Sequence, residues 1–280
     1  MKTYLECIPC FMSQALRAGK FATKDQHQIK KILDRVGYAI QGFSLDQIPP
    51  EMADVIYREI KNITGVEDPY KEIKKSNIAE ALNLYPELKN WVKNSEDPLL
   101  TAIRVAIAGN VIDLGVNKDF NIVEDLKQII KQDFAIFDYQ KFVDRLKETD
   151  SVLYLGDNAG ESVFDKILIE ELKKPVTYAV REIPIINDVT LTDAYSSGLH
   201  EVAEIISSGS TAPATILRLC KEDFINRFNK SEFIISKGQG NFEGLSGSDR
   251  PIFFLLKAKC RVIAKELNVN ENDIILKSIN

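Results

Sequence analysis

Residues 151–161, S-V-L-Y-L-G-D-N-A-G-E, join a short apolar run to a glycine turn that carries an acid and an amide. The run Val152–Leu155 is typical of a strand buried on both faces of a parallel sheet, and the apolar spacing of Ser162–Leu172 predicts a helix after the turn. This order places Asp157 and Asn158 at the carboxyl end of a strand, where open α/β sheets bind ligands. Taken alone, the Asp-Asn pair is equally well explained as a helix cap.

The second half of the chain repeats this alternation of strand and helix. Helical segments separate most of the further expected strands, which predicts an α/β fold with a Rossmann-like, mostly parallel sheet and helices on both faces. No G-x-G-x-x-G follows the first strand and no G-x-x-x-x-G-K-[ST] occurs, so dinucleotide binding and P-loop hydrolysis lack sequence support. The further strands are expected at Val176–Val180, Glu204–Ile206, Phe233–Ile235 and Arg261–Ala264.

The first third of the chain has apolar residues at helical spacing and no strand-like alternation. Pro49-Pro50 is expected to begin one of its helices, where a missing N–H does no harm. In Pro98–Leu114 apolar and small residues surround the helix axis, which predicts a helix buried between layers. We therefore expect an α-helical cap or lid over residues 1–97 and a Rossmann-like catalytic domain over residues 98–280.

Charge and composition narrow the class of protein. The 280 residues carry a net charge of −5 without one basic block, which gives no basis for nucleic-acid binding. The longest apolar runs, such as Pro251–Leu256, are too short to span a membrane, and the first residues lack the apolar core of a signal peptide. We expect a cytoplasmic protein whose oligomeric state the sequence does not indicate.

The pair Cys7-Ile8-Pro9-Cys10 has three readings: half of a zinc site, a redox pair, or two small residues at a helix start. A tetrahedral zinc site needs two more ligands, and there is no second C-x-x-C. Cys260 could approach the pair in the fold and form a cluster of three thiols. The motif is most simply structural.

Polar or small residues follow most of the expected strands. In a parallel sheet these loops fall on one edge, so the oxygen ligands Asp157, Asn158 and Asp188 are expected to converge with a hydroxyl-rich loop (Ser207–Thr215) and with Lys237. Such a set suits a magnesium or manganese ion that holds a phosphorylated substrate. Each loop taken singly is as well explained by the ordinary preference of turns for Asp, Asn, Ser and Gly.

Several strings together resemble one family, the metal-dependent damage-control phosphatases, formerly domain-of-unknown-function family eighty-nine, and in particular its stand-alone archaeal and bacterial branch. They are C-I-P-C, R-V-A-I-A-G-N-V-I-D, L-G-D-N-A-G-E, R-E-I-P-I-I-N-D-V-T, S-S-G-S, S-K-G-Q-G-N-F-E-G-L and P-I-F-F-L-L-K-A-K-C. The resemblance implies a divalent metal on Asp157, Asn158 and Asp188, hydrolysis of phosphomonoesters, and a phosphate-binding Lys237. It also moves Asn110 and Asp113, which share a helix face, from a structural role towards one beside the active site.

The expected chemistry is hydrolysis of a small phosphorylated metabolite with magnesium, manganese, cobalt or nickel. Asp157 or Asp188 would orient or deprotonate a water, or Asp157 would attack phosphorus directly. Two rivals stay open: a Rossmann-like S-adenosylmethionine-dependent methyltransferase, with Glu182 on a ribose, and a non-catalytic phosphometabolite-binding protein. The candidate substrate-binding residues are Asn110, Asp113, Glu161, Arg181, Ser208, Ser210, Lys237 and Asn241.

Overall fold

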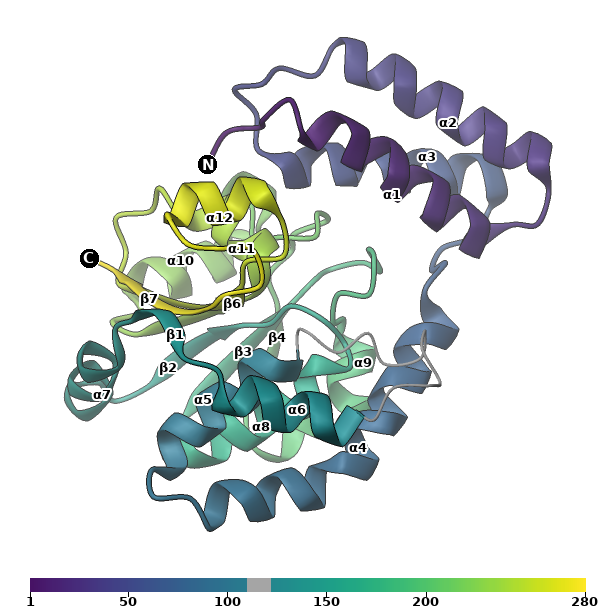
Figure 1. The fold of residues 1–280 in the computed structure, drawn as a ribbon. Coiled ribbons are helices and arrows are strands. Elements are labelled where there is room, and N and C mark those ends of the chain that lie inside the picture. Colours follow the sequence, from purple (N-terminus) through teal and green to yellow (C-terminus); the bar gives the residue numbers. More distant parts are fainter. Residues whose placement is uncertain (110–121) are drawn as a thin grey trace.

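The structure is a computed structural model that describes residues 1–109 and 122–280 (Figure 1). The helices of the described part are α1 (Cys7–Ala22), α2 (Gln26–Gln41), α3 (Pro49–Thr64), α4 (Lys71–Lys93), α5 (Pro98–Gly109), α6 (Ile122–Lys131), α7 (Tyr139–Glu148), α8 (Glu161–Leu172), α9 (Leu191–Ser196), α10 (Glu222–Lys230), α11 (Gly238–Leu245) and α12 (Arg261–Leu267). The strands are β1 (Phe134–Phe137), β2 (Val152–Leu155), β3 (Val176–Val180), β4 (Glu204–Ser207), β5 (Ile234–Lys237), β6 (Ile252–Lys257) and β7 (Ile274–Ile279).

The seven strands form one sheet in the order β1-β7-β6-β5-β2-β3-β4. Strands β2 to β6 pair in parallel, whereas β7 is antiparallel to β6 and parallel to β1. After β2 the chain builds outward through β3 and β4, and it then returns to place β5 on the other side of β2. The carboxyl ends of β2 and β5 therefore flank the point where the strand order reverses, which is the usual ligand site of such sheets. The expected α/β fold with a mostly parallel sheet is confirmed.

Helices cover both faces of the sheet (Figure 1). Within β2, Val152 and Tyr154 join the core cluster shared with α4, α5 and α8, while Leu153 and Leu155 join the cluster shared with α10, α11 and α12. This alternation is the two-residue period of a strand buried on both faces. Helix α5 is the part of the helix expected at Pro98–Leu114 that the structure describes. Its residues from Val105 to Gly109 are all buried, and it packs closely on α8, where a Cβ on Gly109 would lie 2.8 Å from the Phe164 ring.

Helices α1 to α3 pack around a core cluster that is separate from the two flanking the sheet and that includes Phe11, Ile32 and Ile56. Pro49 and Pro50 begin α3, as expected. Helix α4 packs instead on α8, within the cluster that includes the sheet. The division of the chain at residue 97 stays a prediction.

Four of the expected strands are present, and β2 and β3 have the expected bounds. The strand expected at Arg261–Ala264 is wrong, because these residues form the first turn of α12. A four-residue apolar run fits both periods, and here Val262, Ile263 and Leu267 lie on one buried helix face. No helix among residues 1–109 and 122–280 is long and apolar enough to cross a membrane.

Candidate active site

The turn after β2 carries an acid, Asp157, and an amide, Asn158, at the switch point. Gly156 allows this turn, because a Cβ there would lie 2.5 Å from the Tyr178 hydroxyl. Asn158 donates from its amide nitrogen to Asp157 Oδ2 (3.2 Å) and to Glu161 Oε2 (3.3 Å). Glu161 begins α8, so the start of that helix is joined to the turn by a side-chain contact.

The loop after β3 brings Asp188 to the same place. Asn158 and Asp188 form an isolated antiparallel bridge, Ala159 N donates to Asn187 O (2.8 Å), and Val189 N donates to Asp157 O (2.8 Å). The structure thus joins the loops that carry Asp157, Asn158 and Asp188, as their place on one sheet edge predicted. Their role as metal ligands stays a prediction.

Asp157 and Asp188 are both buried, with exposed fractions of 8% and 3%. Burial raises the pKa of Asp188 to about 7, with a further rise from the nearby Asp157 charge, against the opposing effect of Arg181. Mutual repulsion makes it unfavourable for two neighbouring buried carboxylates to be ionised at the same time. A bound cation would offset that repulsion.

Asp157 also rests on the start of α11. Gly238 has a φ of 78°, and a Cβ on it would overlap the Asp157 carboxylate, at 2.9 Å from Oδ1. The absence of a side chain at Gly238 therefore leaves the space that Asp157 fills. Two carboxylates and one amide oxygen fit a hard divalent cation. Across residues 1–109 and 122–280 no three Cys, His, Asp or Glu side chains are grouped to hold an ion, so the predicted set depends on its amide member.

Arg181 and Asn241 are buried at this edge of the sheet and are hydrogen-bonded to each other. Arg181 is 1% exposed and donates to Asp188 Oδ2 (2.7 Å), Thr215 Oγ1 (3.2 Å) and Asn241 Oδ1 (3.0 Å). Asn241 donates in turn to Gly156 O (3.1 Å) and to Lys237 O (2.8 Å). Both side chains therefore hold the ends of β2, β3 and β5 together, and their expected contact with substrate stays a prediction.

Lys237 lies at the end of β5 and is fully buried. Its ammonium donates to Ala106 O (2.8 Å), to Asp165 Oδ1 (2.6 Å) and to Glu161 Oε1. Burial alone would lower the pKa of Lys237, but Asp165 and Glu161 outweigh it and raise that pKa. The structure thus joins Lys237 to Glu161, and through Glu161 to Asn158.

Asp165 and the two tyrosines that bind it were not predicted from the sequence. The hydroxyls of Tyr154 and Tyr178 donate to its two carboxylate oxygens, each at 2.7 Å. Burial, with the nearby Glu161 charge, raises the pKa of Asp165 to about 6 despite the opposing Lys237. One signal was available: a tyrosine inside an otherwise apolar buried strand needs a hydrogen-bond partner.

The remaining candidates lie in different settings. Ser208 donates to Val180 O (2.8 Å) and Ser210 to Ala214 O (2.6 Å), and both side chains are fully buried, so their hydroxyls shape the loop after β4. Asn110 and Asp113 lie outside the described residues.

The cysteine pair begins α1 and lies near Cys260, as the sequence analysis considered. Burial raises the pKa values of the Cys7 and Cys10 thiols, and Cys260 and Glu243 raise them further. Gln239 of α11 donates to Cys260 Sγ (3.6 Å) and to Glu243 Oε1 (2.9 Å). Cys260 thus contacts α11, the helix whose first residue, Gly238, packs against Asp157.

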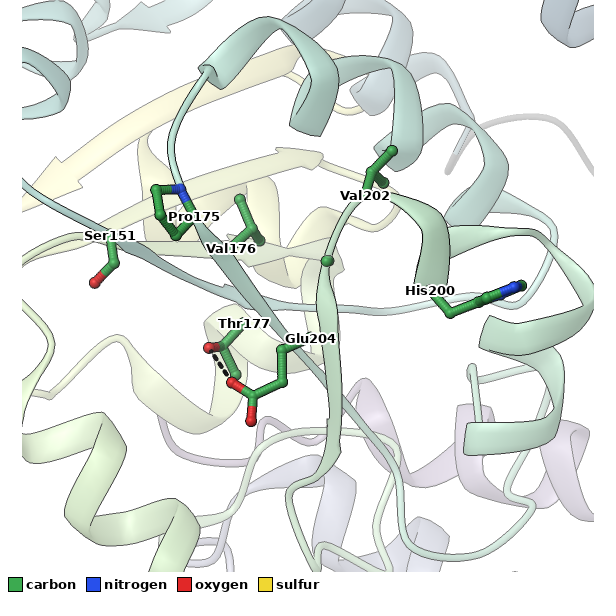
Figure 2. A pocket seen from close by; sticks show the side chains of 8 residues that line it. Ser151, Pro175, Val176, Thr177, His200, Val202 and Glu204 are labelled. Carbon is green, nitrogen blue, oxygen red and sulfur yellow. Dashed lines mark hydrogen bonds between the residues drawn. The ribbon is translucent and has the colours of Figure 1, made fainter.

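A pocket of about 350 Å³ lies at the amino ends of β3 and β4, on the edge opposite this site (Figure 2). Its acid, Glu204, accepts from Thr177 (3.0 Å) and from both terminal nitrogens of Arg227 (3.0 and 3.1 Å). Because these hydrogen bonds occupy the Glu204 carboxylate, we favour the opposite edge of the sheet as the active site.

Comparison with known proteins identifies relatives of this chain in sequence and in structure. The family model for the damage-control phosphatase ARMT1-like domain matches residues 3–275. The damage-control phosphatase PH1575 of Pyrococcus horikoshii is 33% identical over 282 residues, covering 98% of this chain and 97% of that protein. A damage-control phosphatase of Archaeoglobus fulgidus is 34% identical over 292 residues and covers both chains fully. The crystal structure of the P. horikoshii protein, described as a DUF89 family protein, superposes with a TM-score of 0.93 over the whole of both chains, at 32% identity.

Proposed function

The chain belongs to the damage-control phosphatase family with an ARMT1-like domain, and we propose from this that it hydrolyses small phosphomonoesters with a divalent metal held by Asp157, Asn158 and Asp188. Sugar phosphates and related metabolites are the proposed substrate class. Magnesium, manganese, cobalt and nickel are the proposed metals.

One observation supports the metal assignment above the others. The backbone bridge between Asn158 and Asp188 pairs the two loops at the switch point of the sheet, which supports the proposal that their side chains share one ion. Both carboxylates are buried there, and Asp188 is paired with Arg181. A dication held by these oxygens would polarise a phosphate oxygen.

The protein's own groups have distinct parts in this proposal. The pKa of Asp188 is raised without a cation, and a bound cation would lower it, so Asp188 would be ionised in the loaded site and could orient a water or accept its proton. Arg181 fixes its orientation through the 2.7 Å contact. Asp157 would be the second carboxylate of the metal site. In the alternative mechanism Asp157 attacks phosphorus directly.

Lys237 supplies positive charge behind the two loops. All three of its N–H donors have protein partners, Ala106, Glu161 and Asp165. Its proposed phosphate-binding role therefore requires it to exchange one of these partners for a phosphate oxygen. Glu161 is the partner on the side of Asn158, since its other oxygen lies 3.3 Å from the Asn158 amide nitrogen.

The methyltransferase alternative loses its main support. Its ribose-binding candidate, Glu182, is engaged at the surface by Lys221 (2.8 Å) and by Ser207. The family match favours phosphate chemistry. A non-catalytic phosphometabolite-binding protein would share the site and is separated from an enzyme by turnover.

The test is release of inorganic phosphate from a panel of phosphomonoesters with each of the four metals. Wild-type protein should turn over at least one substrate in a metal-dependent way, and Asp157→Ala should not. Asp34→Ala is the matched control, because Asp34 is an exposed acid of α2 paired with Lys30. Binding of a phosphomonoester without turnover would contradict the enzyme assignment, and turnover in excess chelator would contradict the metal.

A further inference from the structure

Ile186 has a backbone conformation that β-branched residues rarely adopt. Its φ is 46°, in the left-handed region, where the branched side chain crowds the backbone. The other non-glycine residues with positive φ in the described part of the chain are one lysine and three asparagines, Lys173, Asn268, Asn272 and Asn280. Such strain persists only where the surrounding structure enforces it, and it is concentrated at functional sites.

The turn containing Ile186 leads directly to Asp188. Asp188 N donates to Ile185 O (3.1 Å), which closes a four-residue turn with Ile186 as its second residue. Turns with positive φ at that position ordinarily use glycine. On its far side the turn is bonded to the loop after β2, where Ala159 N donates to Asn187 O (2.8 Å). The strained residue thus shapes the bend that sets Asp188 against Asn158.

Helices α1 to α3 hold the near side of this turn. Ile185 is 1% exposed and belongs to the core cluster of these helices, with Phe11, Ile56 and Ile60 among its members. Ile186 packs against the same cluster. The conformation at Ile186 is therefore enforced by packing between two isoleucines of the loop and helices more than 100 residues earlier in the chain.

We infer that Ile185 and Ile186 are positioning residues that make the placement of Asp188, and with it the affinity for a divalent cation, depend on the packing of α1 to α3. The inference rests on the proposed metal site. It gives the N-terminal helices a part in cation binding in addition to the expected part as a lid. Residues that orient a metal ligand without touching the metal commonly change affinity by about 10- to 100-fold when they are replaced.

The first test is Ile186→Gly in the full chain, with Mn²⁺ alone as the probe and calorimetric titration as the readout. Glycine relieves the strain but leaves the turn unconstrained, so the dissociation constant should rise about tenfold or more. Turnover of a phosphomonoester should recover at saturating Mn²⁺. The matched control is Lys173→Gly, which relieves a φ of 53° at the end of α8 and should leave Mn²⁺ affinity unchanged.

The second test compares two fully buried isoleucines. Ile56 lies in the cluster of α1 to α3, and Ile252 lies at the start of β6 in a different cluster. Each is replaced by valine. Both variants should lower thermal stability slightly, but Ile56→Val alone should weaken Mn²⁺ binding. A purely structural role predicts no difference in affinity between them.

Unchanged Mn²⁺ affinity in Ile186→Gly, or equal weakening by both valine variants, would overturn the inference while leaving the proposed site in place. Failure of the proposed function has a different signature. If wild-type protein does not bind Mn²⁺, or Asp157→Ala binds it equally well, the metal site itself is wrong and this inference is refuted with it.

Discussion

Replacing Gly238 by alanine separates the backbone's contribution to the candidate site from its contribution to stability. Gly238 begins α11 with a φ of 78°, and a methyl group there would overlap the carboxylate of Asp157. The carboxylate is the end of a rotatable side chain, so it can turn away and the chain can still fold. We expect Gly238→Ala to keep the fold and to weaken cation binding.

The magnitude has two parts. An alanine held in the left-handed region costs about 1–2 kcal/mol, which lowers the melting temperature by roughly 2–4 °C per kcal/mol in a protein of this size class. Displacement of one charged ligand should weaken Mn²⁺ binding by about 10- to 100-fold or more. Gly65→Ala isolates the first part, because Gly65 ends α3 with a φ of 71° and a Cβ on it would meet nothing within 4 Å.

The assay pairs thermal melting without metal with calorimetric titration of Mn²⁺ and turnover of a phosphomonoester. The two alanine variants should melt at similarly lowered temperatures, while only Gly238→Ala loses affinity and turnover. Wild-type affinity in Gly238→Ala would refute the reasoning, because it would show that the orientation of Asp157 on α11 does not matter to the cation. An equal loss in Gly65→Ala would attribute the effect to general destabilisation.

Three further expectations follow from the site. Asp157→Ala should leave circular dichroism and melting close to wild type but lower turnover at saturating Mn²⁺ on the order of a thousandfold or more, with a smaller loss in Asn158→Ala. Near-wild-type turnover in Asp157→Ala would contradict the metal assignment. Cys10→Ser and Cys260→Ser should each keep wild-type turnover in excess Mg²⁺, because a hard cation prefers oxygen, and a loss of several orders of magnitude in a folded variant would place the thiol in the active site. Burial raises the pKa of Glu243 to about 7, so this group favours the folded state progressively less as pH rises from about 4.5 to 7. Glu243→Gln should gain on the order of 3 kcal/mol in unfolding free energy at pH 8.5 and little at pH 4, measured by urea denaturation, and an equal gain at both pH values would contradict the shift.

Features that depend on local sequence were predictable. The buried strand Val152–Leu155, the glycine turn and the following helix each come from neighbouring residues, and Pro49-Pro50 begins a helix because its ring suits the first turn. The proximity of Asp157 to Asp188 was predictable indirectly, from the expected fold, because parallel strands end on the same edge of a sheet. Local pattern failed at Arg261–Ala264, where a short apolar run fits two periods and packing chose the helix.

Partners of buried polar groups were not predictable, because the chain separations are long and the choice is made by packing. Lys237 donates to Ala106, 131 residues away, and to Asp165, 72 residues away. Arg181 reaches Asn241 across 60 residues. Residue type indicates that such groups need partners, but only the assembled layers decide which partners lie within reach.

The loop that carries Asp188 shows both kinds of information side by side. Its sequence, P-I-I-N-D, determined that an acid would follow β3 and that two isoleucines before it would seek an apolar environment. Nothing in those letters indicates that Ile186 takes a positive φ, since isoleucine disfavours it. The conformation was decided by the tertiary structure: burial of Ile185 and Ile186 against α1 to α3, together with the hydrogen bonds to the loop after β2, outweighs the local steric cost.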